Sequence, residues 1–272
     1  MTTSRRPDLE SDIKMAPEYT GVSTVPGNTP LRVYQEQMSK YAFAARYVAR
    51  LRVLDVGCAA GMGVDLFRRS GCAYVVGVEY NPDTLWSNPD RYTGNNAVLV
   101  RGDARALPIA SRSIDLVVML EIIEHIEEDA QVLAEVARVM RADATLICST
   151  PNVCVSRKEN PHHVREYTID AFSRLLGAHF GRIEMYGQSF VRPDQLMLAR
   201  GMRACSTLLR GAAAATGVRG ALRRLKRSLQ RPEPIVTDVM IDVSRLAPAY
   251  AITPYDRSAY AIPSYFMAVC RV

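Results

Sequence analysis

Long hydrophobic runs are absent from this chain of 272 residues. No apolar stretch approaches the roughly 20 residues that an α-helix needs to cross a bilayer, so we expect no membrane span. The opening segment, MTTSRRPDLE, lacks the hydrophobic core that a secretory signal peptide contains. Both absences favour a cytoplasmic location.

Cysteine is scarce and never paired at short spacing. The six cysteines stand at positions 58, 72, 148, 154, 205 and 270, and no two of them form a Cys-x-x-Cys pair. This spacing argues against a zinc ribbon and against a scaffold held together by disulfides. We therefore interpret these side chains as reduced thiols.

Basic residues exceed acidic ones, but the surplus is confined to one segment. The chain has 34 Lys and Arg against 28 Asp and Glu, a formal charge of +6. Between Arg192 and Glu233 there are ten basic and two acidic residues, which is +8 and leaves −2 for the remainder. No aromatic residue stands at positions 191–231 to stack on bases. We favour amphipathic helices with solvated arginines over a basic lid for an anionic acceptor, and we expect no nucleic-acid partner.

Strand-like and helix-like segments alternate through the middle of the chain. Continuous apolar runs predict strands, and apolar residues at helical spacing predict helices. The expected strands are residues 52–56, 74–79, 97–101, 113–119, 144–150, 182–186 and 265–271, and the expected helices are residues 31–50, 63–69, 127–140 and 168–179. This alternation predicts an α/β fold with a mostly parallel sheet and helices on both faces.

The chain is predicted to form one domain with a leader and an insertion. Residues 1–30 are polar and rich in turn residues, which predicts a flexible leader. Residues 31–272 then form the domain. A helical and irregular insertion at about residues 189–263 precedes its last strand.

A glycine-rich loop follows the first expected strand. Gly57, Gly61 and Gly63 have the spacing Gly-x-x-x-Gly-x-Gly, which differs from the dinucleotide-binding and phosphate-loop patterns. Glycines let the backbone turn sharply and approach a ligand closely. Glu79 ends the second strand, where a carboxylate can accept both hydroxyls of a ribose. Asp103 closes the third strand, where it can hold an adenine.

Together these motifs resemble those of the class I S-adenosylmethionine-dependent methyltransferases. The resemblance covers about residues 45–190 and the final strand. It implies a Rossmann-like sheet whose last strand is antiparallel, and S-adenosylmethionine as methyl donor. It assigns the donor site to Asp55, Gly57, Gly61, Gly63, Glu79, Asp103, Ala104 and Glu121. Ala59 stands where the family more often has another glycine, so we expect the loop to differ slightly there.

A second group of residues has the spacing of a metal site. Glu121, Glu124 and His125 follow the fourth strand, and a helical turn beginning there would place them on one face. His162 and His163 lie in the loop after the fifth strand, and the carboxyl ends of neighbouring strands meet at one rim. Oxygen ligands with one or two imidazoles suit Mg²⁺ or Mn²⁺ better than Zn²⁺.

The Glu-x-x-Glu-His pattern is similar to that of a metal-dependent subgroup of the family. This subgroup includes methyltransferases of small-RNA 3′ ends and O-methyltransferases of the ubiquinone pathway. The resemblance implies metal ligation by Glu121, Glu124, His125 and a later histidine, with His163 the better match and His162 the alternative. It also implies that Glu124, His125 and His163 serve the catalysis. In the opposing interpretation, the motif only begins an exposed helix and binds no metal.

The acceptor is predicted from a further resemblance. The first helix and the loop at residues 160–168 are similar to bacterial methyltransferases associated with glycan assembly. The Ala- and Arg-rich insertion is similar to actinobacterial proteins, among them methyltransferases of mycobacterial methylmannose polysaccharides. This resemblance implies O-methylation of a sugar or oligosaccharide, such as a mannoside diol, with His162, Arg165 and Tyr167 contacting the acceptor.

Other functions are compatible with the same motifs. The alternatives are 2′-O-methylation of small RNA and methylation of a quinone or phenol. A non-catalytic binding protein would need a damaged cofactor loop, and this loop is intact apart from Ala59. A homodimer is compatible with the sequence.

Overall fold

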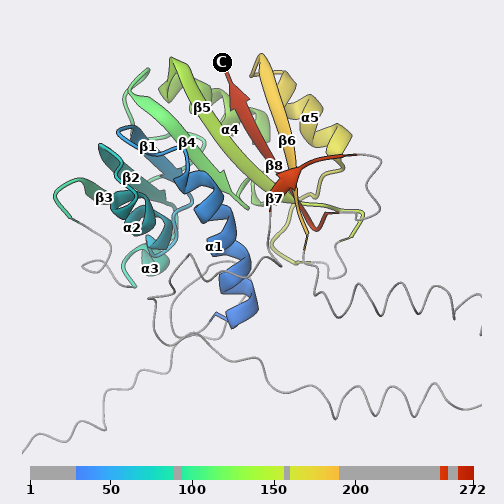
Figure 1. Ribbon diagram of the computed structural model, residues 1–272, viewed down its shortest axis with the longest axis horizontal. Coiled ribbons are helices and arrows are strands. Elements are labelled where there is room, and N and C mark those ends of the chain that lie inside the picture. Colours follow the sequence, from blue (N-terminus) through green and yellow to red (C-terminus); the bar gives the residue numbers. More distant parts are fainter. Residues whose placement is uncertain (1–28, 88–93, 156–159, 190–251, 257–262) are drawn as a thin grey trace, which may run out of the picture.

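The computed structural model describes residues 29–87, 94–155, 160–189, 252–256 and 263–272. Its centre is a single twisted sheet with the strand order β3-β2-β1-β4-β5-β8-β6-β7 (Figure 1). The strands are β1 (Arg52–Val56), β2 (Tyr74–Glu79), β3 (Ala97–Arg101), β4 (Ile114–Leu120), β5 (Met140–Pro151), β6 (Arg182–Gln188), β7 (Ile252–Pro254) and β8 (Tyr265–Arg271). β1 to β5 run parallel, whereas β8 lies antiparallel between β5 and β6. The predicted α/β Rossmann-like fold with a final antiparallel strand is therefore confirmed.

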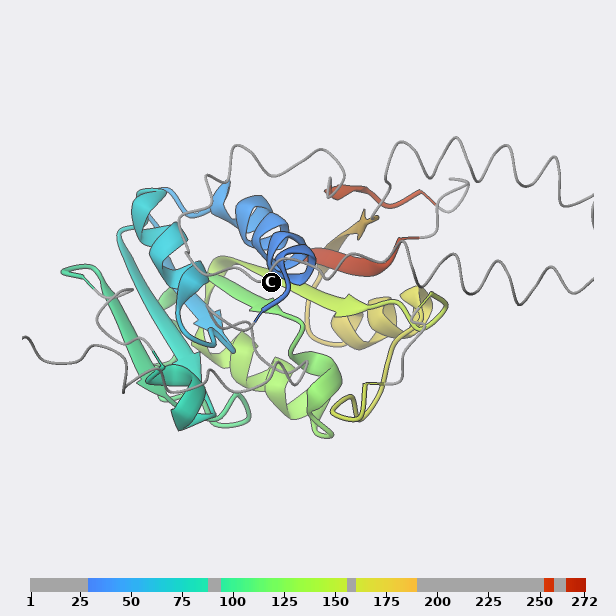
Figure 2. The ribbon, with the colours of Figure 1, turned by 90° about the horizontal axis from the view of Figure 1, so that it is seen from below.

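Helices cover both faces of this sheet. They are α1 (Leu31–Ala45), α2 (Met62–Arg69), α3 (Pro82–Leu85), the 3-10 turn η2 (Ile123–His125), α4 (Asp129–Val139) and α5 (Ile169–Gly177). Figure 2 shows α1 on one side of the sheet and α4 with α5 on the other. In the part of the chain that the structure describes, no helix is long and apolar enough to cross a membrane.

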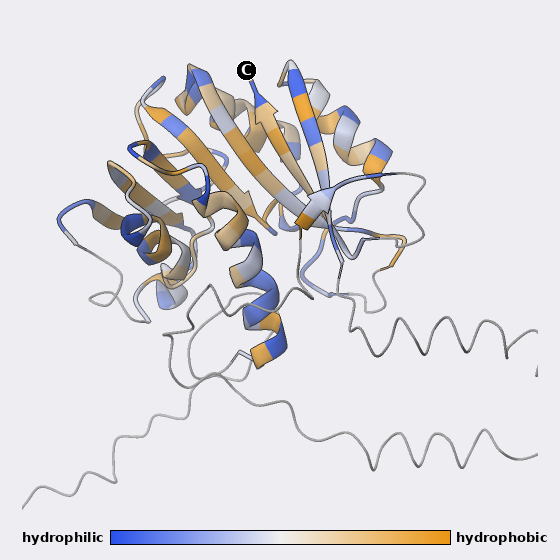
Figure 3. Ribbon diagram, viewed as in Figure 1, coloured by the Kyte–Doolittle hydropathy of each residue, from blue (hydrophilic) through white to orange (hydrophobic). Residues whose placement is uncertain are grey.

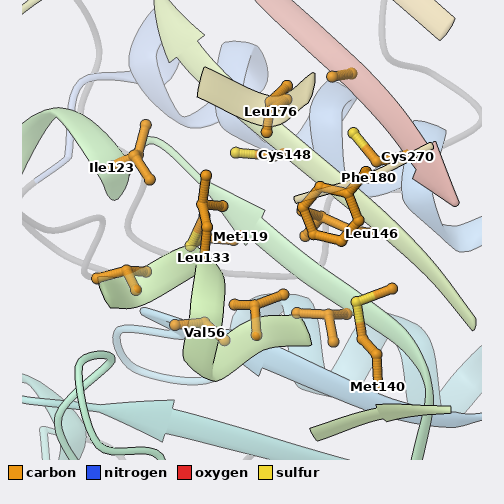
Figure 4. Packing of buried hydrophobic residues seen from close by; sticks show 14 of the residues in the cluster. Val56, Met119, Ile123, Leu133, Met140, Leu146, Cys148, Leu176, Phe180 and Cys270 are labelled. Carbon is orange, nitrogen blue, oxygen red and sulfur yellow. The ribbon is translucent and has the colours of Figure 1, made fainter. Parts of the chain in front are cut away.

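Two apolar layers hold the helices against the sheet. On one face, Leu133 of α4 and Leu176 of α5 form one apolar cluster with Met119 and Leu146 of the sheet (Figure 4). On the other face, residues of α1 and α2 such as Phe67 pack on the opposite side of the central strands. Because β4 and β5 are covered on both faces, their residues are apolar along most of their length (Figure 3).

Local signals set several element ends. Thr168 caps α5 by accepting a hydrogen bond from the backbone N–H of Ala171 at 3.2 Å. Asn81 caps the short helix α3 in the same way, an element that the apolar periodicity did not predict.

β7 is a three-residue edge strand within the segment predicted to be irregular. Of the leader predicted at residues 1–30, residues 1–28 lie outside the described residues, as do residues 190–251 and 257–262 of the insertion predicted at about 189–263.

Candidate active site

A cavity of about 580 Å³ opens at the carboxyl ends of four adjacent strands. Each strand contributes a residue at the point where it ends: Gly57 after β1, Glu79 on β2, Asp103 after β3 and Glu121 after β4. Parallel strands bring their carboxyl ends to one edge of a sheet, which is where α/β folds bind ligands. Four of the predicted donor-site residues therefore surround one cavity.

The glycine loop has the conformation that its composition requires. Gly57 and Gly61 have φ of +74° and +86°, in the left-handed region that glycine adopts at little cost. Gly63 adopts ordinary backbone, but a Cβ atom there would lie 2.0 Å from the Tyr41 ring. Ala59 also has positive φ, +48°, so alanine occupies a conformation that suits glycine better. The loop thus keeps the expected shape with one strained residue.

Glu79 ties the glycine loop to the next strand. Its Oε2 accepts a hydrogen bond from the backbone N–H of Ala59 at 3.0 Å, and its Oε1 accepts one from Asn81 at 2.9 Å. Each carboxylate oxygen has two lone pairs. Glu79 can therefore shape the loop and still accept hydrogen bonds from a ribose in the cavity.

Asp103 is held by a neighbouring arginine. The Arg105 guanidinium donates to both carboxylate oxygens of Asp103, at 2.8 to 3.2 Å, and these hydrogen bonds lower the pKa of Asp103. Arg105 also pairs with Glu128 at 3.2 Å, so it links the end of β3 to the start of α4. Ala104 lines the cavity between them.

Asp55 lies beneath the loop, and it is not one of the residues that line this cavity. Its side chain is completely buried, and Oδ1 accepts a hydrogen bond from the Tyr41 hydroxyl at 3.4 Å. Its Oδ2 has no hydrogen-bond partner among the described residues. Burial raises the pKa of Asp55 to about 8. Its contact with Tyr41 joins β1 to α1 beneath the cavity.

The predicted helical face through Glu121 is wrong. Only Ile123–His125 form a helical turn, and Glu121 precedes it with φ +58°. The Glu121 carboxylate instead accepts a hydrogen bond from the Ser149 hydroxyl at 2.6 Å and pairs with Lys40 Nζ at 3.2 Å. The side chain of Lys40 is fully buried. A cation from α1 thus holds Glu121 at the cavity wall.

Glu124 is buried beside the cavity with one oxygen unsatisfied. Its Oε2 accepts a hydrogen bond from the Thr150 hydroxyl at 3.1 Å, whereas Oε1 has no hydrogen-bond partner in the part of the chain that the structure describes. Burial, with a smaller contribution from the charge of Glu121, raises the pKa of Glu124. Its backbone carbonyl accepts from Val164 at 2.9 Å, which attaches the loop after β5 to the end of β4.

Three predicted metal ligands converge here. The ligand atoms of Glu124, His125 and His163 lie within 4.8 Å of one another. The two imidazole rings meet edge to face, with centroids 4.8 Å apart. Glu121 is not a member of this group. Of the three, only His125 also lines the donor cavity, and its pKa is lowered, chiefly by burial.

Hydrogen bonds orient both rings. His125 Nδ1 lies 2.9 Å from the backbone carbonyl oxygen of His162, and His163 Nδ1 lies 2.9 Å from Glu166 Oε1. The Nε2 atom of His163 lies 3.0 Å from the side-chain amide of Asn160. The His162 side chain is exposed, and this residue reaches the cluster through its carbonyl group.

Arg165 and Tyr167 are engaged with α4 rather than with the cavity. The Arg165 guanidinium contacts the Asp129 carboxylate and donates to the carbonyl of Glu127 at 2.8 Å. The Tyr167 hydroxyl donates to the same Asp129 carboxylate at 2.8 Å, and its ring is buried against Phe172. These contacts anchor the segment that carries His163.

Comparison with known proteins agrees with this geometry. Residues 54–148 match the family model of the methyltransferase domain. A protein of Mycolicibacterium smegmatis named "Probable S-adenosylmethionine-dependent methyltransferase" is 29% identical over 175 residues, which is 62% of this chain and 67% of that protein. A protein of the same description from Mycobacterium tuberculosis is 31% identical over 179 residues, covering 62% of this chain and 63% of its own length. Residues 54–148 therefore match a methyltransferase domain, and the wider match is to proteins described as probable S-adenosylmethionine-dependent methyltransferases.

Solved structures share this fold. The crystal structure of an S-adenosylmethionine-dependent methyltransferase from Mesorhizobium loti matches with a TM-score of 0.52 and 14% identity, covering 87% of this chain and all of that chain. The matched segment spans only about two thirds of the mycobacterial relatives.

Three residues of the methyltransferase site were not predicted as donor- or metal-site residues. Lys40 holds Glu121, Tyr41 contacts both Gly63 and Asp55, and Arg105 holds Asp103. The first two come from α1, whose contact with the loop depends on folding rather than on spacing in the sequence. Arg105 is the one of the three whose role could have been inferred from the sequence, because it lies two residues after Asp103.

Proposed function

We propose that this methyltransferase transfers the methyl group of S-adenosylmethionine to a hydroxyl of a sugar or oligosaccharide, with a divalent cation bound by Glu124, His125 and His163. The observation that carries the proposal is the convergence of these three side chains beside the donor cavity. His125 belongs to both the cavity and the cluster. Donor and cation would therefore act on the same acceptor oxygen.

The cavity fits the donor. Its volume of about 580 Å³ falls within the roughly 300–1,000 Å³ typical of small-molecule sites. Gly57 and Gly63 line the cavity and let the backbone lie close to a ligand, and Glu79 offers a carboxylate to the ribose. Asp103 and Ala104 border the part of the cavity assigned to the adenine.

The cluster fits a divalent cation. Within the described ranges, Glu124 Oε1 is buried without a hydrogen-bond partner, and such an atom is costly unless something binds it. With Glu121 held by Lys40, the set is one carboxylate and two imidazoles, which favours Mn²⁺ over Mg²⁺ because Mg²⁺ prefers oxygen ligands. When bound, the cation would be chelated by two adjacent acceptor hydroxyls and would lower the pKa of the hydroxyl that attacks the methyl group.

The chemistry needs a positioned oxygen and a proton acceptor. The acceptor oxygen forms a bond to the methyl carbon while the bond from carbon to the sulfonium breaks, which leaves S-adenosylhomocysteine. The hydroxyl proton passes to solvent water, because His125 has its Nδ1 proton on the His162 carbonyl and its Nε2 lone pair reserved for the cation. A mannoside suits this arrangement because its adjacent hydroxyls can chelate one ion.

The test is a methyl-transfer assay with radiolabelled donor and three acceptor classes, namely neutral manno-oligosaccharides, single-stranded RNA and catechols. We expect labelling of the sugar, stimulated by Mn²⁺ and abolished by EDTA. Glu124→Ala and His163→Ala should each lower kcat at least 100-fold. His179→Gln is the matched control, because His179 lies at the end of α5 and outside the cluster.

The outcomes separate the alternatives. Labelling of RNA with a steep salt dependence would replace the sugar by a nucleic acid. Labelling of catechol alone would assign the enzyme to phenols. Full activity in EDTA, together with an active Glu124→Ala variant, would remove the metal from the proposal while leaving methyl transfer intact.

A further inference from the structure

The loop at residues 160–166 holds two histidines in the same tautomer. A backbone carbonyl oxygen can only accept a hydrogen bond, so His125 Nδ1, 2.9 Å from the His162 carbonyl, carries the proton. The other ring nitrogen, Nε2, therefore has a lone pair. The His162 carbonyl thus presets His125 as an Nε2 ligand.

The tautomer of His163 follows from Asn160. The Asn160 Oδ1 accepts a hydrogen bond from the backbone N–H of His162 at 3.0 Å, which fixes the orientation of the side-chain amide. The amide nitrogen of Asn160 then faces His163 Nε2 at 3.0 Å and donates to it. Nδ1 must carry the proton, which it donates to Glu166 Oε1 at 2.9 Å.

We propose that Glu166 and the His162 carbonyl are positioning groups that present both imidazoles through Nε2, and that Asn160 is a latch that occupies the His163 lone pair until a cation displaces its amide. This inference rests on the metal site of the proposed function. Metal-bound histidines commonly donate their second N–H to a carboxylate or a carbonyl, and His163 and His125 already have these two partners.

Displacing the Asn160 amide requires only a local movement, because the rest of the loop is held by other contacts. Val164 N–H donates to the Glu124 carbonyl, and Arg165 is anchored on Asp129. These contacts keep the His163 side of the loop attached to β4 and α4. Asn160, by contrast, holds His163 through its amide and the backbone of His162 through Oδ1. Movement of the Asn160 side chain alone would therefore free Nε2.

The first test uses the metal-free protein. Long-range ¹H–¹⁵N correlation of ¹⁵N-histidine-labelled protein should show Nδ1–H and unprotonated Nε2 for His125 and His163, assigned with His125→Gln and His163→Gln. An Nε2–H tautomer at either residue would overturn the inference. The measurement needs neither methyl donor nor acceptor, so it is independent of activity.

The second test measures Mn²⁺ binding by electron paramagnetic resonance, with Mn²⁺ alone as the probe. Asn160→Ala should bind Mn²⁺ about 3- to 10-fold more tightly, because one competing hydrogen bond is lost. Glu166→Gln should bind about 10-fold more weakly. Asn96→Ala and Glu184→Gln are the matched controls on distant elements.

The results distinguish this inference from the proposed function. Weaker binding by Asn160→Ala, unchanged binding by Glu166→Gln, or no Mn²⁺ binding by the unaltered chain would overturn the latch. Expected binding shifts without methylation of any sugar would support the latch and contradict the proposed acceptor. Sugar methylation that is unchanged in Asn160→Ala and Glu166→Gln would contradict the latch and support the proposed acceptor.

Discussion

Ala59 adopts a backbone conformation that costs free energy in any residue with a Cβ atom. Its φ of +48° lies in the left-handed region, where an L-residue loses about 1–2 kcal/mol. Part of this cost is recovered because alanine has less freedom than glycine in the unfolded chain. We expect Ala59→Gly to raise the free energy of unfolding by up to about 1 kcal/mol in urea titrations.

Ala59→Val is the matched variant for this measurement. A β-branched side chain is still less compatible with positive φ, so this variant should unfold at lower urea concentration. A glycine variant less stable than the unaltered chain would show that the loop is not strained at this position. Both variants keep the backbone N–H that Glu79 accepts.

Asp55 should make stability depend on pH in a particular direction. Its pKa is about 8 in the folded protein and about 3.9 in an unfolded chain. Between these values the unfolded state releases the proton while the folded state keeps it. The stability is therefore greatest at the acidic end and is lost as the pH rises towards 8.

The variant that isolates this effect is Asp55→Asn, which cannot ionise. We expect its stability relative to the unaltered chain to improve by on the order of 3 kcal/mol between pH 5 and pH 8, measured by urea unfolding at each pH. Other titrating groups cancel because they are common to both proteins. A difference that stays constant with pH would contradict burial of a neutral carboxyl at this position.

At the scale of elements, α1 is bound to the site through one buried ion pair. Lys40 has no exposed side-chain surface, lies over the Tyr265 ring at 3.5 Å, and pairs with Glu121 at 3.2 Å. Removing the cation would leave a largely buried carboxylate uncompensated. We expect Lys40→Met to lose about 3–5 kcal/mol of stability, and Lys40→Met/Glu121→Gln to recover most of it.

A double-mutant cycle by urea unfolding measures this coupling. Arg52→Gln is the comparison, because Arg52 and Asp115 form an exposed pair that water screens, and its loss should be much smaller. A Lys40→Met variant as stable as the unaltered chain would mean that the pair contributes no net stability. Glu121 would then become a candidate for a fourth metal ligand, because its pairing with Lys40 would not be needed for stability.

Elements with local signals were predictable, and those that depend on distant contacts were not. The central strands are largely apolar, and Thr168 is a typical N-cap residue at the start of α5. These segments were therefore predicted from the sequence alone. The helical turn was wrongly extended to Glu121 because its conformation depends on Lys40, 81 residues away in sequence. β7 has only three residues, too few for an apolar pattern, and its place depends on pairing with β6.

The same division separates the two halves of the site in the whole molecule. The donor cavity is formed by segments that directly follow four strands, and the strand order brings their ends together. Its residues could therefore be proposed from motifs. The second half combines α1, η2 and the loop after β5, whose contacts join residues far apart in the sequence, as between Lys40 and Glu121 or between Glu124 and Val164. His163 was consequently preferred over His162 only through a family resemblance, and the structure places His163 beside Glu124.

Because donor binding involves the ends of four strands, it should stabilise the domain as a whole. A ligand that binds only the folded state adds about 2.7 kcal/mol at 100 times its Kd, which corresponds to roughly 5–10 °C in Tm for a domain of this size. We expect a shift of this order with S-adenosylhomocysteine in differential scanning fluorimetry. NAD⁺ shares the adenosine but should give no shift, because the glycine spacing is not that of a dinucleotide site. Equal shifts with both ligands would indicate adenosine recognition without a methyl-donor site, and no shift with either would contradict the assignment of this cavity to the donor.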